Sequence, residues 1–431
     1  TAAGNGGFNG GTKRMKKYYD EREKATFKDR KSLQDQKLMA MVKLGYKKSA
    51  RLKKILDRHG IHPAKIKTRE DLENLPVTSR EKLVDMEMLD MPYAGLENPS
   101  VAIDRIFTSP GPVYEPHLPE TDILWARAFF AAGIGPGDIA LNAFSYHLVA
   151  AGLTFHNGLR KVGATVVPSG TSSSQVQVQL IRDLNVTAYV GTPSFLMSII
   201  HQAKEMGYDF KKDFRVKKAC FAAEPLLPSL QQMFEKEYGI DTYQMYGATE
   251  VGDVAYECSQ KSGWHVCEET IVEIVDPVTG KNVAPGELGE VVVTRLNDIF
   301  FLLRFGTGDL SRLTTERCAC GRTSCRLAGI AGRVGDAVKV RGLFIAPSQL
   351  KLFSSKFDHL PVQAVVTRTG HEDVLTLHVE KVVNQENTKA WEQKLKKIFK
   401  EICTVKIDAL GYVQAGTITS DSKLILDQRQ W

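Results

Sequence analysis

The chain has 431 residues, of which 43% are hydrophobic, and this length exceeds what one hydrophobic core usually serves. A quarter of the residues are charged, and the apolar runs are much shorter than the roughly 18 residues of a membrane span. We therefore expect a soluble protein of two domains without membrane contact. Residues 1–12 are rich in Gly and Asn and lack the apolar segment of a signal peptide. They predict a loose arm and a cytoplasmic location.

The net charge is +7, and the densest basic run covers residues 47–54. A basic run of this kind can bind nucleic acid. Here, however, Leu52 and Ile55 alternate with the lysines in a helical pattern that ends before Gly60, and no aromatic stacking platform accompanies it. A solvated helix face is the better interpretation, so we expect no nucleic-acid partner. The sequence leaves a homodimer open.

From residue 138 onward, apolar strand-like segments alternate with helix-length amphipathic segments. This alternation predicts right-handed crossovers and a largely parallel sheet. The expected strands are Asp138–Phe144, Ala164–Pro168, Ala188–Gly191, Lys218–Ala222 and Asp241–Tyr246. The expected helices lie near residues 150–162, 174–184, 194–206 and 226–238, the last of which ends at Gly239.

In a parallel sheet the loops that lead from strand to helix all lie at the carboxyl edge, where open α/β sheets bind ligands. Five such loops carry polar or aromatic side chains, so they are expected to converge on one cleft. They are Phe144–His147, Ser169–Thr171, Thr192–Ser194, Ala223–Pro225 and Tyr246–Glu250.

Residues 270–314 contain short strand-like segments and a Pro285–Gly286 turn, which predicts a β subdomain beside the sheet. After Gly335 the chain alternates strand and helix patterns up to residue 412. The expected fold class is therefore α/β, with a large N-terminal domain over residues 1–334. That domain holds the parallel sheet, its helices and the β subdomain. A small α+β C-terminal domain is expected over residues 335–431.

Short segments in a fixed order resemble the adenylate-forming acyl-CoA synthetase superfamily. They are YGATE from Tyr246, GELGEVVVT from Gly286, RFGTGDL from Arg304, GRVGDAVKVRG from Gly332 and TSDSK from Thr419. Three further segments are similar to the phenylacetate-CoA ligase branch, namely LENLPVTSREKL from Leu72, FAAEP from Phe221 and CACGRTSCR from Cys318. The resemblance covers nearly all of the chain from about residue 18.

The resemblance implies that a carboxylate attacks the α-phosphorus of ATP to give an acyl-adenylate, after which coenzyme A displaces AMP. Glu250 would be a hard oxygen ligand for Mg²⁺, and Thr249 would donate to the α-phosphate. Lys423 would stabilise charge that develops between acid and phosphate, with an exposed tail lysine as the alternative. Further residues are expected to bind ATP or AMP: Tyr246, Gly247, Ala223, Glu224 and Pro225 at the adenine, Asp309 at the ribose, and Arg333 at the ribose or phosphate.

Two segments depart from the superfamily pattern. Where a phosphate-binding loop is expected, residues 107–116 contain three prolines without an N–H and the negatively charged Glu115. Triphosphate binding by this loop is therefore in question, unless contacts to the α-phosphate suffice. At the hinge before the small domain, Gly335 stands where relatives have Asp, and glycine can absorb the rotation that domain alternation needs.

Cysteine and histidine residues at 258–325 predict a metal centre. Three thiolates and an imidazole suit a tetrahedral structural Zn²⁺, for which we assign Cys258, His265, Cys318 and Cys320. With four protein ligands no open position remains, so no catalytic role is expected. The alternative is a set of buried free thiols.

The acid pocket is expected to be lined by Tyr146, His147 and Phe195, unless these are core residues. Such a pocket suits a phenylacetate-like or benzoate-like acid, with an aliphatic acid left open. The leading hypothesis is an ATP-dependent acid:coenzyme A ligase. One alternative is a catalytically impaired relative that only binds a nucleotide or acyl group, and the other is an adenylating enzyme with an acceptor other than coenzyme A.

Overall fold

The structure is a computed structural model that describes residues 16–109, 113–117, 124–277, 279–287, 289–330, 332–334, 338–341, 343–345, 347–370, 372–380, 389–403, 405–419 and 422–429. The amino-terminal arm expected at residues 1–12 and the hinge at Gly335 lie outside these residues. No helix in the described ranges combines the length and apolar character of a membrane span.

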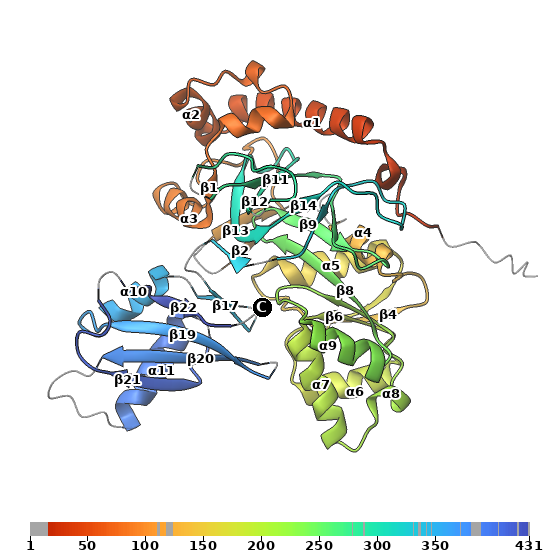
Figure 1. The fold of residues 1–431 in the computed structure, drawn as a ribbon, viewed down its shortest axis with the longest axis vertical. Helices are drawn as coiled ribbons and strands as arrows, with labels where there is room; N and C mark the ends of the chain where they lie inside the picture. The colour runs from red at the N-terminus through yellow and green to blue at the C-terminus, as the bar shows by residue number, and fades with distance from the viewer. Residues whose placement is uncertain are drawn as a thin grey trace, which may run out of the picture.

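A nine-stranded sheet forms the centre of the large part of the molecule, in the order β14-β15-β10-β9-β8-β7-β6-β4-β5 (Figure 1). The strands from β8 to β5 are parallel: β4 (Ile139–Asn142), β5 (Thr165–Val167), β6 (Ala188–Gly191), β7 (Lys218–Phe221) and β8 (Asp241–Ala248). These are the five strands that the sequence predicts. The antiparallel remainder comprises β9 (Gly252–Glu257), β10 (Trp264–Val266), β14 (Leu313–Thr314) and β15 (Arg326–Leu327).

Helices cover both faces of the parallel strands. Alternate strand residues separate two cores: α4 (Ala126–Ala131) and α5 (Ala150–Lys161) pack on one face, and α6 (Ser174–Asp183), α7 (Pro193–Glu205), α8 (Phe210–Asp213) and α9 (Pro228–Gln232) pack on the other. Because β4 pairs with β5 on one side and β6 on the other, the winding direction reverses there. Such a reversal opens a crevice at the carboxyl ends of β4 and β6.

Two sequence expectations need correction here. The helix expected at residues 226–238 begins at Pro228, which pre-sets the first helical turn, and its second half is a π-helical segment, Met233–Glu237. The segment still ends at Gly239 with φ +67°, as expected. The Tyr246–Glu250 segment does not lead to a helix, because Val251 N–H bonds Ala248 O in a tight turn that returns the chain as β9.

A second sheet corresponds to the expected β subdomain. Its strands are β1 (Thr78–Ser79), β11 (Thr270–Val275), β12 (Gly289–Arg295), β13 (Phe305–Ser311) and β16 (Gly332–Arg333), ordered β1-β13-β12-β11 with β16 beside β13. Helices α1 (Phe27–Lys48), α2 (Ala50–Arg58) and α3 (Arg80–Leu89) surround it, together with the 3₁₀ turns Glu21–Lys24, Pro63–Lys65 and Arg69–Asn74. On α2 the side chains of Leu52 and Leu56 are buried while Lys53 and Lys54 are exposed, as a solvated helix face requires.

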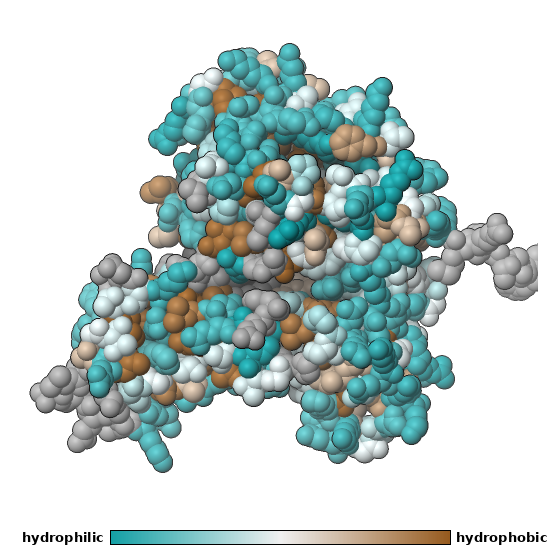
Figure 2. Space-filling view, in the orientation of Figure 1, coloured by the Kyte–Doolittle hydropathy of each residue, from teal (hydrophilic) through white to brown (hydrophobic). Residues whose placement is uncertain are grey.

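The residues from 338 onward build the expected α+β arrangement around a hydrophobic core of their own. A four-stranded sheet runs β21 (Ala409–Val413), β20 (Glu372–Glu380), β19 (Val362–Thr369) and β22 (Ile425–Asp427), with α10 (Pro347–Ser355), α11 (Lys389–Cys403) and the hairpin of β17 (Val338–Val340) and β18 (Leu343–Ile345). Figure 2 shows hydrophilic side chains over α1, α2 and the lower helices, with hydrophobic ones gathered near the centre, where the parts meet.

Candidate active site

A cavity of about 1840 Å³ lies at the carboxyl edge of the parallel strands and extends to the C-terminal α+β part. All five loops that were expected to converge contribute to its lining. The contributing residues are Phe144 and Ser145, Thr171, Thr192 and Ser194, Ala223–Pro225, and Tyr246–Glu250. The prediction of one shared cleft is therefore confirmed.

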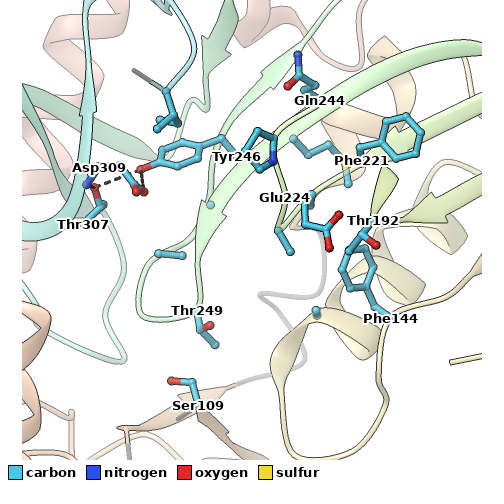
Figure 3. Close-up of a pocket in the computed structure, with 18 of the residues that line it drawn as sticks. Ser109, Phe144, Thr192, Phe221, Glu224, Gln244, Tyr246, Thr249, Thr307 and Asp309 are labelled. Carbon is cyan, nitrogen blue, oxygen red and sulfur yellow. Dashed lines mark hydrogen bonds between the residues drawn. The ribbon is translucent and has the colours of Figure 1, made fainter. Parts of the chain in front are cut away.

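At one end of the cavity, Tyr246 and Asp309 form a hydrogen-bonded group (Figure 3). The Tyr246 hydroxyl donates to Asp309 Oδ2 at 2.9 Å and lies 3.2 Å from Thr307 Oγ1. Arg333 pairs with the other Asp309 oxygen at 3.4 Å, because β16 places it directly opposite Asp309 on β13. Burial and the Asp309 charge raise the pKa of Tyr246 well above its usual value, so the hydroxyl remains a donor. Three residues predicted for the nucleoside thus lie together.

The ring of Tyr246 stacks on Trp264, with centroids 5.7 Å apart and planes at 27°. Trp264 also lines the cavity. Sequence reasoning missed this residue, although its place immediately before the proposed metal ligand His265 is a signal that it is held in a fixed strand. One face of the tyrosine is therefore supported by a second aromatic ring.

The loop after β7 contributes Ala223 in the left-handed region, with φ +72°. Glu224 Oε2 accepts a hydrogen bond from Ser194 N–H at 3.3 Å, which links this loop to the start of α7. A Cβ at Gly247 would lie 2.6 Å from the Trp125 ring and 2.3 Å from a backbone oxygen, so only glycine fits there. This close approach keeps β8 against the cavity floor.

The β8–β9 turn presents Thr249 and Glu250 to the cavity. Glu250 is buried, with 7% of its surface exposed, and one carboxylate oxygen pairs with the guanidinium of Arg80. Its other oxygen, Oε2, has no hydrogen-bond partner among the described residues. The carboxylate thus has a partner that sequence reasoning did not assign.

The residues expected to line the acid pocket do not all reach the cavity. Phe195 lines it, but Tyr146 and His147 do not. The Tyr146 hydroxyl accepts a hydrogen bond from Asn142 Nδ2 at 2.8 Å and lies 3.2 Å from His156 Nδ1, so it is held at the carboxyl end of β4. The His147 side chain is exposed. The expected lining by these two residues is wrong because the loop after β4 turns their side chains away.

An aromatic wall takes their place. Phe144 and Trp125 both pack edge-on against Phe155, with centroids 4.8 Å and 4.9 Å apart, and all three line the cavity. Trp125 adopts φ +70° at the start of α4, in the left-handed region that is costly for a bulky residue. The tryptophan is buried in the core beside α5 and also lines the cavity.

Lys423 lines the cavity from the C-terminal α+β part. It follows a turn in which Thr419 N–H bonds Ser422 Oγ at 3.0 Å, and its carbonyl accepts from Gln363 at 2.7 Å. The lysine backbone is therefore anchored beside β19. Ser420 and Asp421 lie outside the described residues.

Where a phosphate-binding loop was expected, the chain forms the hairpin of β2 (Arg105–Ser109) and β3 (Val113–His117). Backbone amides on it are already bonded: Thr108 N–H to Leu148 O at 2.9 Å, and Tyr114 N–H to Glu87 at 3.0 Å. Glu115 is buried, and burial raises its pKa to about 8 despite the charge of Arg80. The two amides of Thr108 and Tyr114 are therefore not available to a phosphate, and residues 110–112 between the strands lie outside the described residues.

The four residues predicted as metal ligands lie together. The ligand atoms of Cys258, His265, Cys318 and Cys320 are all within 4.8 Å of one another, and all four residues are buried. Cys258 Sγ and Cys318 Sγ are 3.7 Å apart, close to the roughly 3.8 Å between two thiolates on a tetrahedral zinc. Cys320 Sγ is 3.4 Å from His265 Nε2, and His265 Nδ1 is 3.3 Å from Ser324 Oγ. The donor set and its spacing fit zinc.

Comparison with known proteins gives the family. The profile of AMP-binding enzymes matches residues 122–297. The chain is 30% identical over 378 residues to the phenylacetate-coenzyme A ligase of Thermus thermophilus, covering 84% of both chains. It is 32% identical over 377 residues to that of Escherichia coli, again covering 84% of both. The chain belongs to the phenylacetate-CoA ligase family.

Solved structures support the fold of this phenylacetate-CoA ligase family member. A 2-hydroxyisobutyryl-CoA ligase in its thioesterification state has a TM-score of 0.88 at 22% identity, over 96% of this chain and 93% of the other. The same ligase in a postadenylation state has a TM-score of 0.71 at 21% identity, over 97% and 94%. The fold is that of adenylate-forming ligases, and the arrangement of its two parts is more similar to the first of these structures.

Proposed function

We propose that the chain is an ATP-dependent acid:coenzyme A ligase that acts on an aromatic carboxylic acid. An acid oxygen attacks the α-phosphorus of ATP, and pyrophosphate leaves with the electron pair of the broken bond. The thiol of coenzyme A then attacks the acyl carbon, and AMP leaves. The observation that carries this proposal is the convergence of five loops on one cavity in a member of the phenylacetate-CoA ligase family. We also propose a cytoplasmic location, where both cosubstrates are available.

The nucleoside binds at the Tyr246 end of the cavity. Asp309 accepts hydrogen bonds from the ribose hydroxyls, an arrangement supported by the Tyr246 donor that fixes its second oxygen at 2.9 Å. The Tyr246 ring, backed by Trp264, supplies an aromatic surface for the adenine. The Ala223–Pro225 segment, with Gly247 beside it, closes the other side, and Arg333 reaches the ribose or phosphate.

The phosphates bind near the β8–β9 turn. Thr249 donates its hydroxyl to the α-phosphate, at the turn that Gly252 makes possible with φ +73°. Magnesium, when bound, is held by Glu250 and neutralises phosphate charge. The unpartnered Oε2 of Glu250 supports this assignment, because a buried carboxylate oxygen without a partner is costly.

Lys423 brings positive charge to the acid and the α-phosphate during adenylation. We propose that residues 1–334 and 335–431 are two domains and that the second moves between the half-reactions. The unequal TM-scores of 0.88 and 0.71 support this, because they come from two states of one ligase. In the present arrangement Lys423 is at the cavity edge, on the face of the small domain that holds Gln363.

The acid itself lies against Phe144, Phe155 and Trp125, with Phe195 from α7 completing the lining. A flat ring gains edge-to-face contacts with such a wall that an aliphatic chain does not. The position at the carboxyl ends of β4 and β6 supports the assignment, since that is where the sheet opens.

A structural zinc is proposed on Cys258, His265, Cys318 and Cys320. The four ligands come from the turn after β9, strand β10 and the loop before β15, so the ion would link three segments of the chain. We assign it no part in the reaction.

Pyrophosphate release with a panel of carboxylic acids, with and without coenzyme A, tests the function. Release with aryl acids, and thioester formed only when coenzyme A is present, is the expected result. No release with any acid would mean that the chain only binds a nucleotide or acyl group. Release without thioester, together with product formed on added amines, would identify a different acceptor.

A further inference from the structure

In the described residues 105–109 and 113–117, two backbone amides that a phosphate could use already have partners. This hairpin pairs β2 with β3 directly, and the described amides of Thr108 and Tyr114 are bonded to Leu148 and Glu87. A nucleoside triphosphate that binds here needs hydrogen-bond donors other than these two amides. Figure 3 shows Ser109 below Thr249, at the end of the pocket away from the Tyr246 ring.

Arg80 is the cationic side chain that the fold brings to this point. Strand β1 pairs in parallel with β13, matching Thr78 with Phe305 and Ser79 with Gly306. Ser79 then caps α3, and Arg80 is the first helical residue. Its side chain lines the cavity and keeps 20% of its surface exposed. The LPVTSREKL segment, to which no other role falls, thus delivers one arginine to the site.

Two contacts of Arg80 link the β8–β9 turn to strand β2. One terminal nitrogen pairs with Glu250 Oε1, and the other donates to Ser109 Oγ at 3.0 Å. Ser109 in turn donates to Glu115 Oε1 at 3.1 Å. Oε2 of Glu115 and Oε2 of Glu250 are both buried without a hydrogen-bond partner among the described residues.

Carboxylates and a second cation act on Arg80. Burial, the largest cause, lowers the pKa of Arg80, the charge of Glu115 raises it and that of Arg333 lowers it, and the guanidinium remains protonated. The side chain is therefore a partly buried cation held among acidic groups, which phosphate oxygens can replace as its partner. A guanidinium can bind phosphate oxygens with two parallel N–H bonds, which a lysine cannot.

We propose that Arg80 binds the β- and γ-phosphates of ATP, with Ser109 and Glu115 as positioning residues. This rests on the proposed function. When ATP enters, the guanidinium exchanges Glu250 for phosphate oxygens, and the Glu250 carboxylate becomes available to the cation that accompanies the nucleotide. As the α-phosphorus bonds the acid oxygen, the bridging oxygen keeps the electron pair, and Arg80 stabilises the charge on the departing pyrophosphate.

The test compares Arg80→Gln and Arg80→Lys with Arg58→Gln, an exposed arginine at the end of α2. Calorimetry with pyrophosphate and with AMP needs no turnover, so it separates this proposal from the proposed ligase activity. Arg80→Gln is expected to weaken pyrophosphate binding at least tenfold and to raise the KM for ATP similarly, with AMP affinity within about twofold. Arg80→Lys should recover part of the loss, and Arg58→Gln should match the wild type.

Equal pyrophosphate affinity in Arg80→Gln and wild type overturns the proposal. So does an equal loss of AMP and pyrophosphate binding, which would make Arg80 only a structural partner of Glu250. Thermal melting of each variant identifies one that fails to fold, and Arg80→Lys then decides the outcome. If the wild type binds pyrophosphate through Arg80 yet activates no acid, the ligase assignment is wrong but the proposed phosphate site at Arg80 is retained. For Glu115→Gln, a raised KM for ATP with kcat preserved is expected of a positioning residue.

Discussion

Trp264 stacks on Tyr246 at 5.7 Å and is followed in β10 by His265, whose Nε2 lies 3.4 Å from Cys320 Sγ. The strand that backs the proposed adenine surface is therefore the strand that carries one ligand of the cysteine–histidine cluster. Strand β10 has only three residues and pairs with the two-residue strand β15 on one side. Short strands have few hydrogen bonds of their own, so we expect a metal bound by the cluster to help hold Trp264 in place.

Removal of a metal ligand should therefore weaken the nucleotide site. If the wild type binds the proposed zinc at about one equivalent, Cys318→Ser is expected to lose it, to have a lower melting temperature and to bind AMP more weakly. Elemental analysis, thermal melting and calorimetry measure the three effects. Cys325→Ser is the matched control, because this cysteine lies in the same loop but outside the cluster. Wild-type protein with no bound metal would show that the residues are buried free thiols.

The Tyr246–Asp309 hydrogen bond should contribute to nucleotide affinity in two separable ways. Tyr246→Phe keeps the ring on Trp264 but removes the donor to Asp309, so AMP binding should weaken about fivefold, or about 1 kcal/mol. Asp309→Asn loses the charged acceptor for the ribose and should weaken it by about ten- to hundredfold. Calorimetry with AMP measures both. If Asp309→Asn binds AMP like the wild type, the ribose lies elsewhere.

The role proposed for Lys423 separates the half-reactions. Lys423→Ala should slow pyrophosphate release about a hundredfold or more, because it removes charge stabilisation from the adenylation step only. Thioester formation from a synthetic acyl-adenylate and coenzyme A should be preserved. Lys400→Ala, at the exposed end of α11, is the control. A variant with normal adenylation would leave Lys423 without a role in the mechanism.

Much of this site is visible in the sequence because its residues follow predicted strands. Thr249 and Glu250 follow β8, and Ala223–Pro225 follow β7. The alternation of strand and helix patterns therefore places these residues at the carboxyl edge of the sheet. Arg80 could not be found in the same way. Its contact with Glu250 spans 170 positions and depends on two-residue strand β1 pairing with β13, which no local pattern encodes. The wrong assignment of Tyr146 and His147 has a related cause. No local sequence pattern determines which way the side chains of their loop point.

The stability of the chain should depend on the pH through Glu115. Its folded pKa of about 8 lies above the ordinary 4.5, so the unfolded chain releases this proton first. The free energy of unfolding therefore falls as the pH rises from 4.5 to 8, and the effect is complete above the folded pKa. Glu115→Gln removes this fall. Its stability relative to the wild type should rise across the window by at most about 5 kcal/mol.

Urea unfolding at pH 5 and pH 8 measures this difference. Glu21→Gln serves as the control, because the Glu21 side chain is 87% exposed. If the free energy of unfolding changes equally between pH 5 and pH 8 in the wild type and in Glu115→Gln, Glu115 is ionised in the folded protein at both pH values. Glu87, whose pKa burial raises to about 7, contributes a smaller dependence of the same sign to both proteins and cancels in the comparison.

The aromatic wall predicts which acids are accepted. Phe144 is half-buried, lines the cavity and packs on Phe155 at 4.8 Å, so we expect it to contact the acid without being central to the core. Phe144→Ala should raise the KM for aryl acids about tenfold, since edge-to-face contact and buried area are lost together. Short aliphatic acids should change less than threefold, because they reach fewer atoms of the ring.

A panel of aryl and aliphatic acids at saturating ATP measures this, with Phe27→Ala, an exposed phenylalanine at the start of α1, as control. The ratio of kcat/KM between the two acid classes is the decisive quantity, because a general loss of folding lowers both classes alike. An unchanged ratio would remove the wall from acid selection. It would also place the ring of the acid nearer Phe195, on the α7 side of the crevice between β4 and β6.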